Sequence, residues 1–175
     1  MAELYDKITA STITTHEPIL REAPDLDDAW WDGLSTALDA IAAVPSDRVA
    51  VRQEYLDRAI PQYLGISIET KVPAWTTAHG DLHWANLTGP TLTVLDWEGW
   101  GAAPAGYDAA LLYSYSLLVP ETAVQVRSRL GHVLDTPTGR FAELVVITEL
   151  LQTITRGDNL DLEGVLRSRL SALTR

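Results

Sequence analysis

The sequence contains no cysteine, and this absence excludes disulfide bonds and thiolate metal sites. No apolar run approaches the roughly 18 residues that a transmembrane helix needs. The first ten residues carry Glu3, Asp6 and Lys7 and lack the apolar centre of a secretory signal. We therefore expect a cytoplasmic protein without a membrane partner.

Positive charge is also scarce, and lysine occurs only as Lys7 and Lys71. The 13 Lys and Arg residues face 24 Asp and Glu residues, which gives a net charge of −11. A nucleic-acid-binding protein needs a positive surface to displace counterions from phosphates, so nucleic acid is not an expected partner. The negative charge favours solubility, and it also suits a cationic small molecule.

The chain is long enough for one domain with its own core, since 46% of its 175 residues are apolar. Residues 1–20 are rich in Thr and Ile, which favours an extended N-terminal arm, and residues 21–175 are predicted to form a single domain. A helix is expected after Pro24, with Pro45 at its end, and a second helix from an N-cap at Ser46 to Pro61. Further helices are predicted near 107–119, 121–134, 138–155 and 161–173.

A small β element is predicted in the middle of the chain. Residues 75–79 have the pattern of a short strand, and residues 86–87 and 92–95 flank a tight turn at Thr88-Gly89-Pro90. The expected fold is therefore mainly α with a small β-hairpin element, an α+β arrangement.

Three polar residues around this hairpin carry a chemical pattern. Asp81 is followed by Asn86 at the fifth position, and the hairpin returns the chain so that Asp96 comes near Asn86. Carboxylate and amide oxygens are hard ligands that suit Mg²⁺. Kinases use the same order: an Asp, an Asn five residues later, and a second metal-binding Asp on the next hairpin.

Two motifs make the pattern more specific: His-Gly-Asp-Leu-His-Trp-Ala-Asn at 79–86 and Leu-Asp-Trp-Glu at 95–98. Together they resemble the aminoglycoside phosphotransferase family, which shares the protein-kinase fold and includes antibiotic, choline and homoserine kinases. The resemblance covers roughly residues 24–175 and extends through Gly101, Pro104 and Asp108. It departs at Ala102-Ala103, where the family has the Asp of a Gly-Asp-Pro stretch.

The resemblance implies a protein-kinase-like large, C-terminal lobe and a role for each matching residue. Asp81 resembles the catalytic base, and Asn86 and Asp96 resemble the Mg²⁺ ligands. His79 and Asp108 resemble residues that support the catalytic loop. Substrate or secondary roles are expected for four further residues: His83, Trp97, Glu98 and Trp100. The implied reaction transfers a phosphoryl group from ATP or GTP to a small hydroxylated or amine-bearing molecule.

The small lobe of such kinases has no counterpart here. That lobe supplies a glycine-rich loop over the phosphates and a strand lysine, and neither pattern occurs in the sequence. Lys71 lies just before the catalytic loop, where it cannot replace that lysine. We therefore expect weak nucleotide binding by this chain alone. The face left bare should be covered by residues 1–20, by a partner protein or by a second copy.

Three functions remain open at this point. The first is a reduced phosphotransferase that depends on a partner. The second is a non-catalytic, kinase-like binding protein, or pseudokinase. The third is a metal-dependent hydrolase, suggested by the alternation of His79, Asp81 and His83 near Asp96 and Glu98.

Overall fold

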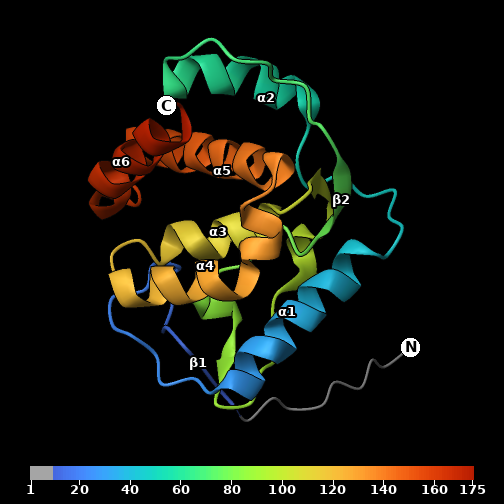
Figure 1. Ribbon diagram of the computed structural model, residues 1–175, viewed down its shortest axis with the longest axis vertical. Helices are drawn as coiled ribbons and strands as arrows, with labels where there is room; N and C mark the ends of the chain where they lie inside the picture. The colour runs from blue at the N-terminus through green and yellow to red at the C-terminus, as the bar shows by residue number, and fades with distance from the viewer. Residues whose placement is uncertain (1–9) are drawn as a thin grey trace.

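The computed structural model describes residues 10–175 and is mainly helical, as the sequence predicted (Figure 1). It contains two small antiparallel sheets, where the sequence predicted one small β-hairpin element. Residues 1–9 of the predicted N-terminal arm lie outside the described residues. In the described part, no helix is both long and apolar enough to cross a membrane. The α-helices are α1 Asp28–Ala42, α2 Gln53–Ala59, α3 Tyr107–Tyr115, α4 Pro120–Leu134, α5 Pro137–Thr155 and α6 Glu163–Leu173.

Three of the four strands, β2 to β4, lie between α2 and α3 in the chain, and β1 precedes α1. Strand β2 (Trp75–Ala78) pairs antiparallel with β4 (Gly101–Pro104), and β1 (Ser11–Thr12) pairs antiparallel with β3 (Thr88–Gly89). The predicted hairpin is present, because Leu87 and Val94 form an antiparallel bridge. The sequence did not indicate β4, since glycine, alanine and proline have low strand propensity.

The prediction of a helix starting at Ser46 was wrong. The chain before α2 is extended instead, and Val49 forms a parallel bridge with Ala102 of β4. The backbone N–H groups of Ala50 and Val51 both donate to the Ala102 carbonyl oxygen at 3.0 Å. Pairing with a distant strand thus overrides the local capping pattern, and the helix begins only at Gln53. Pro61 does not end the helical path either, since a π-helical turn, Ile60–Leu64, continues it.

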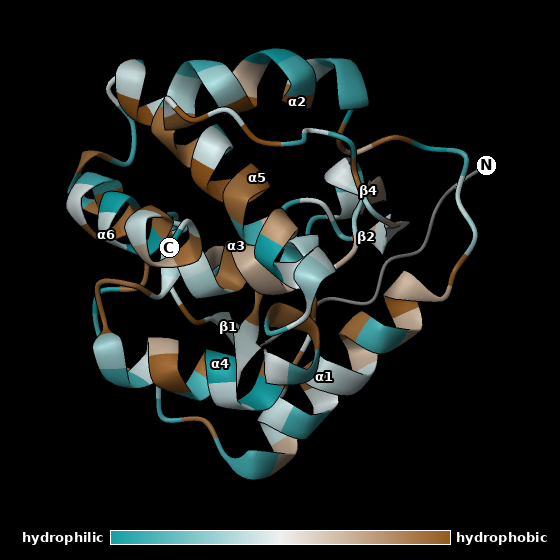
Figure 2. Cartoon of the chain, turned by 45° about the horizontal axis from the view of Figure 1, so that its top comes forward, coloured by the Kyte–Doolittle hydropathy of each residue, from teal (hydrophilic) through white to brown (hydrophobic). Residues whose placement is uncertain are grey.

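The core lies around α5, which packs against α3, α4, α6 and the π-helical turn. Figure 2 shows hydrophobic residues on α5 and hydrophilic residues on the outer side of α2. A second centre is built from Trp30, Trp31 and Trp84, all at most 3% exposed. The indole N–H of Trp84 donates to the Ser116 hydroxyl at 3.0 Å. This packing anchors the segment that follows Asp81 to helices α1 and α3.

A buried ion cluster joins α4, α5 and α6. The Glu143 carboxylate is 1% exposed and accepts one bond from Arg127, at 3.0 Å, and two from Arg169, at 2.6 and 2.9 Å. Both guanidinium groups also lie over the Tyr113 ring, 5.2 and 5.5 Å from its centroid. Three hydrogen bonds and two cations therefore compensate the buried carboxylate of Glu143.

Candidate functional site

Asp108, in the first turn of α3, holds the backbone of the loop that carries Asp81. One carboxylate oxygen of Asp108 accepts the backbone N–H of His79 at 2.7 Å, and the other accepts that of Gly80 at 3.0 Å. Asp108 is 7% exposed, and its burial raises the pKa of this carboxyl above the usual range. The N-terminus of α3 thereby fixes the backbone directly before Asp81.

Both ring nitrogens of His79 are engaged inside the protein. Nδ1 accepts the backbone N–H of Asp81 at 3.3 Å, so Nε2 carries the proton and donates to the Leu95 carbonyl oxygen at 2.8 Å. The His79 side chain is fully buried. His79 therefore links the loop that carries Asp81 to the hairpin that carries Asp96, and neither of its ring nitrogens remains for a metal ion.

Asp81, His83 and Asn86 lie together at the surface end of the loop. His83 Nε2 is 3.5 Å from Asp81 Oδ2, and the Asp81 side chain is 53% exposed. The hydrogen bond from His83 is the main reason that the pKa of Asp81 lies below its usual range, so this carboxylate is ionised at neutral pH. The amide N–H of Asn86 donates to the Asp81 carbonyl oxygen at 2.9 Å, and the Asn86 Oδ1 accepts no bond within residues 10–175.

The hairpin brings the backbone of Leu95, the residue before Asp96, against Asn86. The Leu95 N–H donates to the Asn86 carbonyl oxygen at 2.9 Å, which ties the residue before Asp96 to Asn86. Asp96 has a left-handed backbone, with φ 59° and ψ 73°, and its side chain is exposed. Few non-glycine residues adopt this conformation, and those that do are concentrated at functional sites. The Trp97 ring lies edge-on against the His79 ring, with the centroids 4.9 Å apart.

The remaining predicted residues lie on the outer side of this hairpin. The Glu98 side chain is exposed, while its backbone oxygen accepts a bond from Arg48 at 2.7 Å. The same guanidinium lies 5.1 Å from the Trp100 ring centroid. Trp97 is 44% exposed, so it does not belong to the core. Trp97 and Trp100 line an open apolar hollow of about 350 Å³ with Ala40, Ile41, Val44 and Thr77.

Gly80 allows the two halves of the site to touch. It has φ +86°, and a Cβ at this position would lie 2.3 Å from the Gly99 carbonyl oxygen. The backbones of the loop that carries Asp81 and of the segment after Asp96 are therefore in direct contact. Only glycine satisfies both the left-handed conformation and this close approach.

Replacing Gly80 with alanine is expected to lower the free energy of unfolding by roughly 2–4 kcal/mol, because it adds backbone strain and a clash with rigid backbone. Urea unfolding of the purified variant measures this loss. Gly157→Ala is the matched control, since Gly157 has φ +99° and a Cβ there would meet nothing within 4 Å. Equal losses in both variants would show that the contact between Gly80 and Gly99 contributes nothing.

Sequence reasoning missed Glu149, a carboxylate on α5 without a cationic partner among the described residues. Its Oε2 accepts the Tyr107 hydroxyl at 2.6 Å, and burial raises the pKa of Glu149 to about 7. The available signal was a single glutamate within the mainly apolar run 145–151.

Sequence reasoning also missed Tyr115. Its ring lies 6.0 Å from the His83 ring. Burial raises the pKa of its phenol, with smaller contributions from the charges of Asp81 and Glu149.

The raised pKa of Glu149 predicts a pH-dependent stability. Between the unfolded value near 4.5 and the folded value of about 7, the folded state binds the extra proton, so stability falls as pH rises through this window. At pH 8 the free energy of unfolding of Glu149→Gln should therefore exceed that of the original protein by roughly 2 kcal/mol, and at pH 5 by much less. Urea titrations of both proteins at the two pH values test this. A difference that does not change with pH would contradict it.

Comparisons of the chain with models of known families, with curated proteins and with solved structures found no match in any of the three. The assignment of a function therefore depends on the residues and their geometry.

Proposed function

We propose that the chain is the large lobe of a phosphotransferase similar to the aminoglycoside phosphotransferase family. The observation that carries this proposal is the fixed arrangement of Asp81, Asn86 and the Asp96 hairpin. His79 and Asp108 hold that arrangement through four hydrogen bonds: two to the Asp108 carboxylate and two to the His79 ring. The donor would be ATP or GTP, and the acceptor a small hydroxylated molecule. An acceptor that carries an amine would suit the net charge of −11.

The donor atoms present fit a Mg²⁺ ion, the cofactor of this reaction class. The Asn86 amide nitrogen is held by Asp81, which leaves the Asn86 Oδ1 without a donor in the described part, and the Asp96 carboxylate is exposed. Among residues 10–175 no three His, Asp or Glu side chains form a metal site by themselves. A magnesium ion in a kinase takes its remaining ligands from phosphate and water, and when bound it neutralises charge on the phosphates.

In this proposal the residues of the chain have separate tasks. The ionised Asp81 carboxylate accepts a hydrogen bond from the acceptor hydroxyl and then its proton. His83, 3.5 Å from the Asp81 Oδ2, orients that carboxylate. Asn86 and Asp96 would hold the metal ion. The engagement of both His79 nitrogens supports this assignment over the metal-dependent hydrolase, which needs a free imidazole nitrogen.

The apolar hollow beside Trp97 and Trp100 supports a dependence on a second lobe. It lies between the C-terminal end of α1, β2 and the segment that follows Asp96. Its one polar lining residue, Thr77, donates its hydroxyl to the Val44 carbonyl oxygen, so the lining offers little to hold phosphates. Within residues 10–175 the one lysine, Lys71, is exposed and lies in the segment beside α2. We propose that a partner protein or a second copy covers this hollow and supplies the phosphate-binding cation. The absence of a lysine near Asp81 and Asp96 among residues 10–175 also favours the second candidate, a pseudokinase that binds a ligand without turnover.

Calorimetric titration with ATP and Mg²⁺ tests the proposal. We expect binding in the millimolar range that is lost in Asp96→Ala and retained in Glu98→Gln, because Asp96 is proposed as a metal ligand and Glu98 is not. No magnesium-dependent binding, or equal binding in both variants, would overturn the metal site.

A second experiment measures turnover with an active partner and an acceptor. Asp81→Asn should keep nucleotide binding, and its rate should fall by a factor of about 10²–10⁴. Turnover unchanged by Asp81→Asn would exclude the proposed base, and binding without any turnover would favour the pseudokinase.

A further inference from the structure

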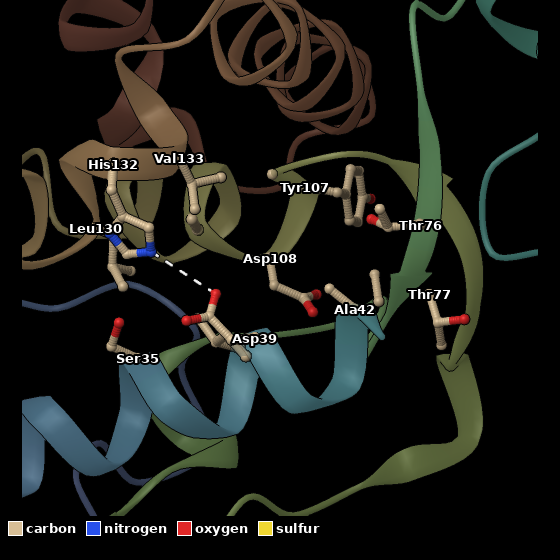
Figure 3. A pocket seen from close by; sticks show the side chains of 14 residues that line it. Ser35, Asp39, Ala42, Thr76, Thr77, Tyr107, Asp108, Leu130, His132 and Val133 are labelled. Atoms are coloured by element: carbon tan, nitrogen blue, oxygen red, sulfur yellow. Dashed lines mark ion pairs between the residues drawn. The ribbon is translucent and has the colours of Figure 1, made fainter. Parts of the chain in front are cut away.

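A second, smaller hollow lies behind the catalytic loop, between α1, β2, α3 and α4 (Figure 3). Its volume is about 60 Å³. A water molecule needs roughly 10–15 Å³ by the same measure, so there is room for a ligand of a few heavy atoms. Asp81, Asn86 and Asp96 do not line it, and it is therefore distinct from the candidate site.

The entrance of this hollow is polar and its walls are apolar. Asp39 and Ser35 of α1 face His132 of α4 at the entrance, where His132 Nε2 lies 3.7 Å from Asp39 Oδ1 (Figure 3). Both side chains of that pair are more than half exposed, so the entrance is accessible from solvent. Leu38, Leu130 and Val133 contribute to the walls. A ligand that fits must therefore combine a polar end with a short aliphatic body.

The carboxylate of Asp108 belongs to the inner wall of the same hollow (Figure 3). It accepts two backbone N–H bonds, although a carboxylate has about four acceptor sites. None of the ion pairs formed by residues 10–175 involves Asp108. The buried Glu143, in contrast, has two arginine partners. Asp108 therefore retains acceptor capacity and has no ion-pair partner among residues 10–175.

We propose that this hollow binds a small alkylammonium ion, with its ammonium group between Asp39 and Asp108 and its aliphatic part against Leu38, Leu130 and Val133. Two carboxylates exclude an anion from the hollow. A neutral apolar molecule would fill the space but would leave Asp108 without a counter-charge. A cation with a short aliphatic chain satisfies both the charge and the walls.

Occupation of the hollow would act on the candidate site through two elements. Asp108 holds the N–H groups of His79 and Gly80, and β2, which leads directly into His79, forms part of the hollow's wall. A bound cation stabilises the ionised form of Asp108, which is the form that accepts both N–H bonds. The ligand would thereby stabilise the catalytic loop. An effect on catalysis rests on the proposed function, whereas the binding itself does not.

The test is a titration of the isotope-labelled chain with n-propylammonium chloride, followed by NMR. We expect saturable shifts at the amides of Asp39, Ala42 and Val133, and slower hydrogen exchange at His79 and Gly80. Asp39→Asn should weaken binding about fivefold, the factor set by an exposed ion pair. Asp47→Asn removes the same charge outside the hollow and should leave binding unchanged. Ser35→Leu, which fills the entrance, should abolish it.

Several outcomes would overturn the proposal. These are equal shifts with n-propanol or with sodium chloride, unchanged binding in both Asp39→Asn and Ser35→Leu, and shifts confined to residues outside the hollow. The readout contains no nucleotide. A failure here therefore leaves the phosphotransferase proposal standing, and a failure of ATP binding leaves this site standing.

Discussion

Asp108→Ala is expected to lower the free energy of unfolding by roughly 3–5 kcal/mol, because the backbone N–H groups of His79 and Gly80 lose their acceptor inside the protein. Each buried, unsatisfied N–H group costs about 1–3 kcal/mol. Domains of this size are stable by only about 5–15 kcal/mol, so the loss is a large part of the total. Urea unfolding monitored by circular dichroism measures it.

Hydrogen exchange separates this effect from a general loss of packing. In Asp108→Asn, which keeps the shape of the side chain, exchange should accelerate at His79 and Gly80 before it does in α5. Asp158→Ala is the control, since Asp158 is exposed and should change stability by less than about 0.5 kcal/mol. If His79 and Gly80 exchange no faster in Asp108→Asn than in the original protein, Asp108 does not support the loop.

Glu143→Ala is expected to cost a similar amount, roughly 3–5 kcal/mol, for a different reason. The variant leaves Arg169, whose side chain is 20% exposed, without its carboxylate partner, and it leaves Arg127, 24% exposed, with Asp135 alone. Chemical unfolding measures the loss, which should persist at high salt because the pair is shielded from solvent ions.

Glu163→Ala provides the comparison for that result. Glu163 forms an exposed pair with Arg167 on α6 at 2.9 Å, and the two side chains are 45% and 56% exposed. An exposed pair one helical turn apart contributes about 0.3–0.5 kcal/mol. Losses of the same size in Glu163→Ala and Glu143→Ala would mean that the buried cluster is dispensable.

The elements that the sequence predicted are those with strong local patterns. Proline stands at the first position of α4 and α5, and Asp27 caps α1 through the Trp30 N–H at 2.8 Å. The strand at Trp75 and the turn at Gly89-Pro90 were also marked by composition. The extended chain at 48–51 could not be predicted, because it is held by pairing with a strand about 50 residues away.

The candidate site shows the same division. The order of Asp81, Asn86 and Asp96 along the chain was readable, and so was the hairpin that ties Leu95 to Asn86. The support of this loop by His79 and Asp108 was expected from the family resemblance alone. The individual hydrogen bonds, including the one from His79 to Leu95, could not be predicted, because these residues meet only in the folded chain. Glu149 was missed because its surroundings are set by the packing of α5 against α3, which leaves it without a cationic partner among residues 10–175.

The two hydrogen bonds of the His79 ring make it a spectroscopic probe of the site. With Nδ1 accepting and Nε2 donating, the two nitrogens should give separate ¹⁵N resonances, one of pyridine type and one of pyrrole type. The Nε2 resonance reports the distance to the hairpin that carries Asp96, and the Nδ1 resonance reports the backbone at Asp81. A single labelled histidine can therefore register, in one spectrum, whether a metal ion, a nucleotide or a partner lobe has moved either half of the site.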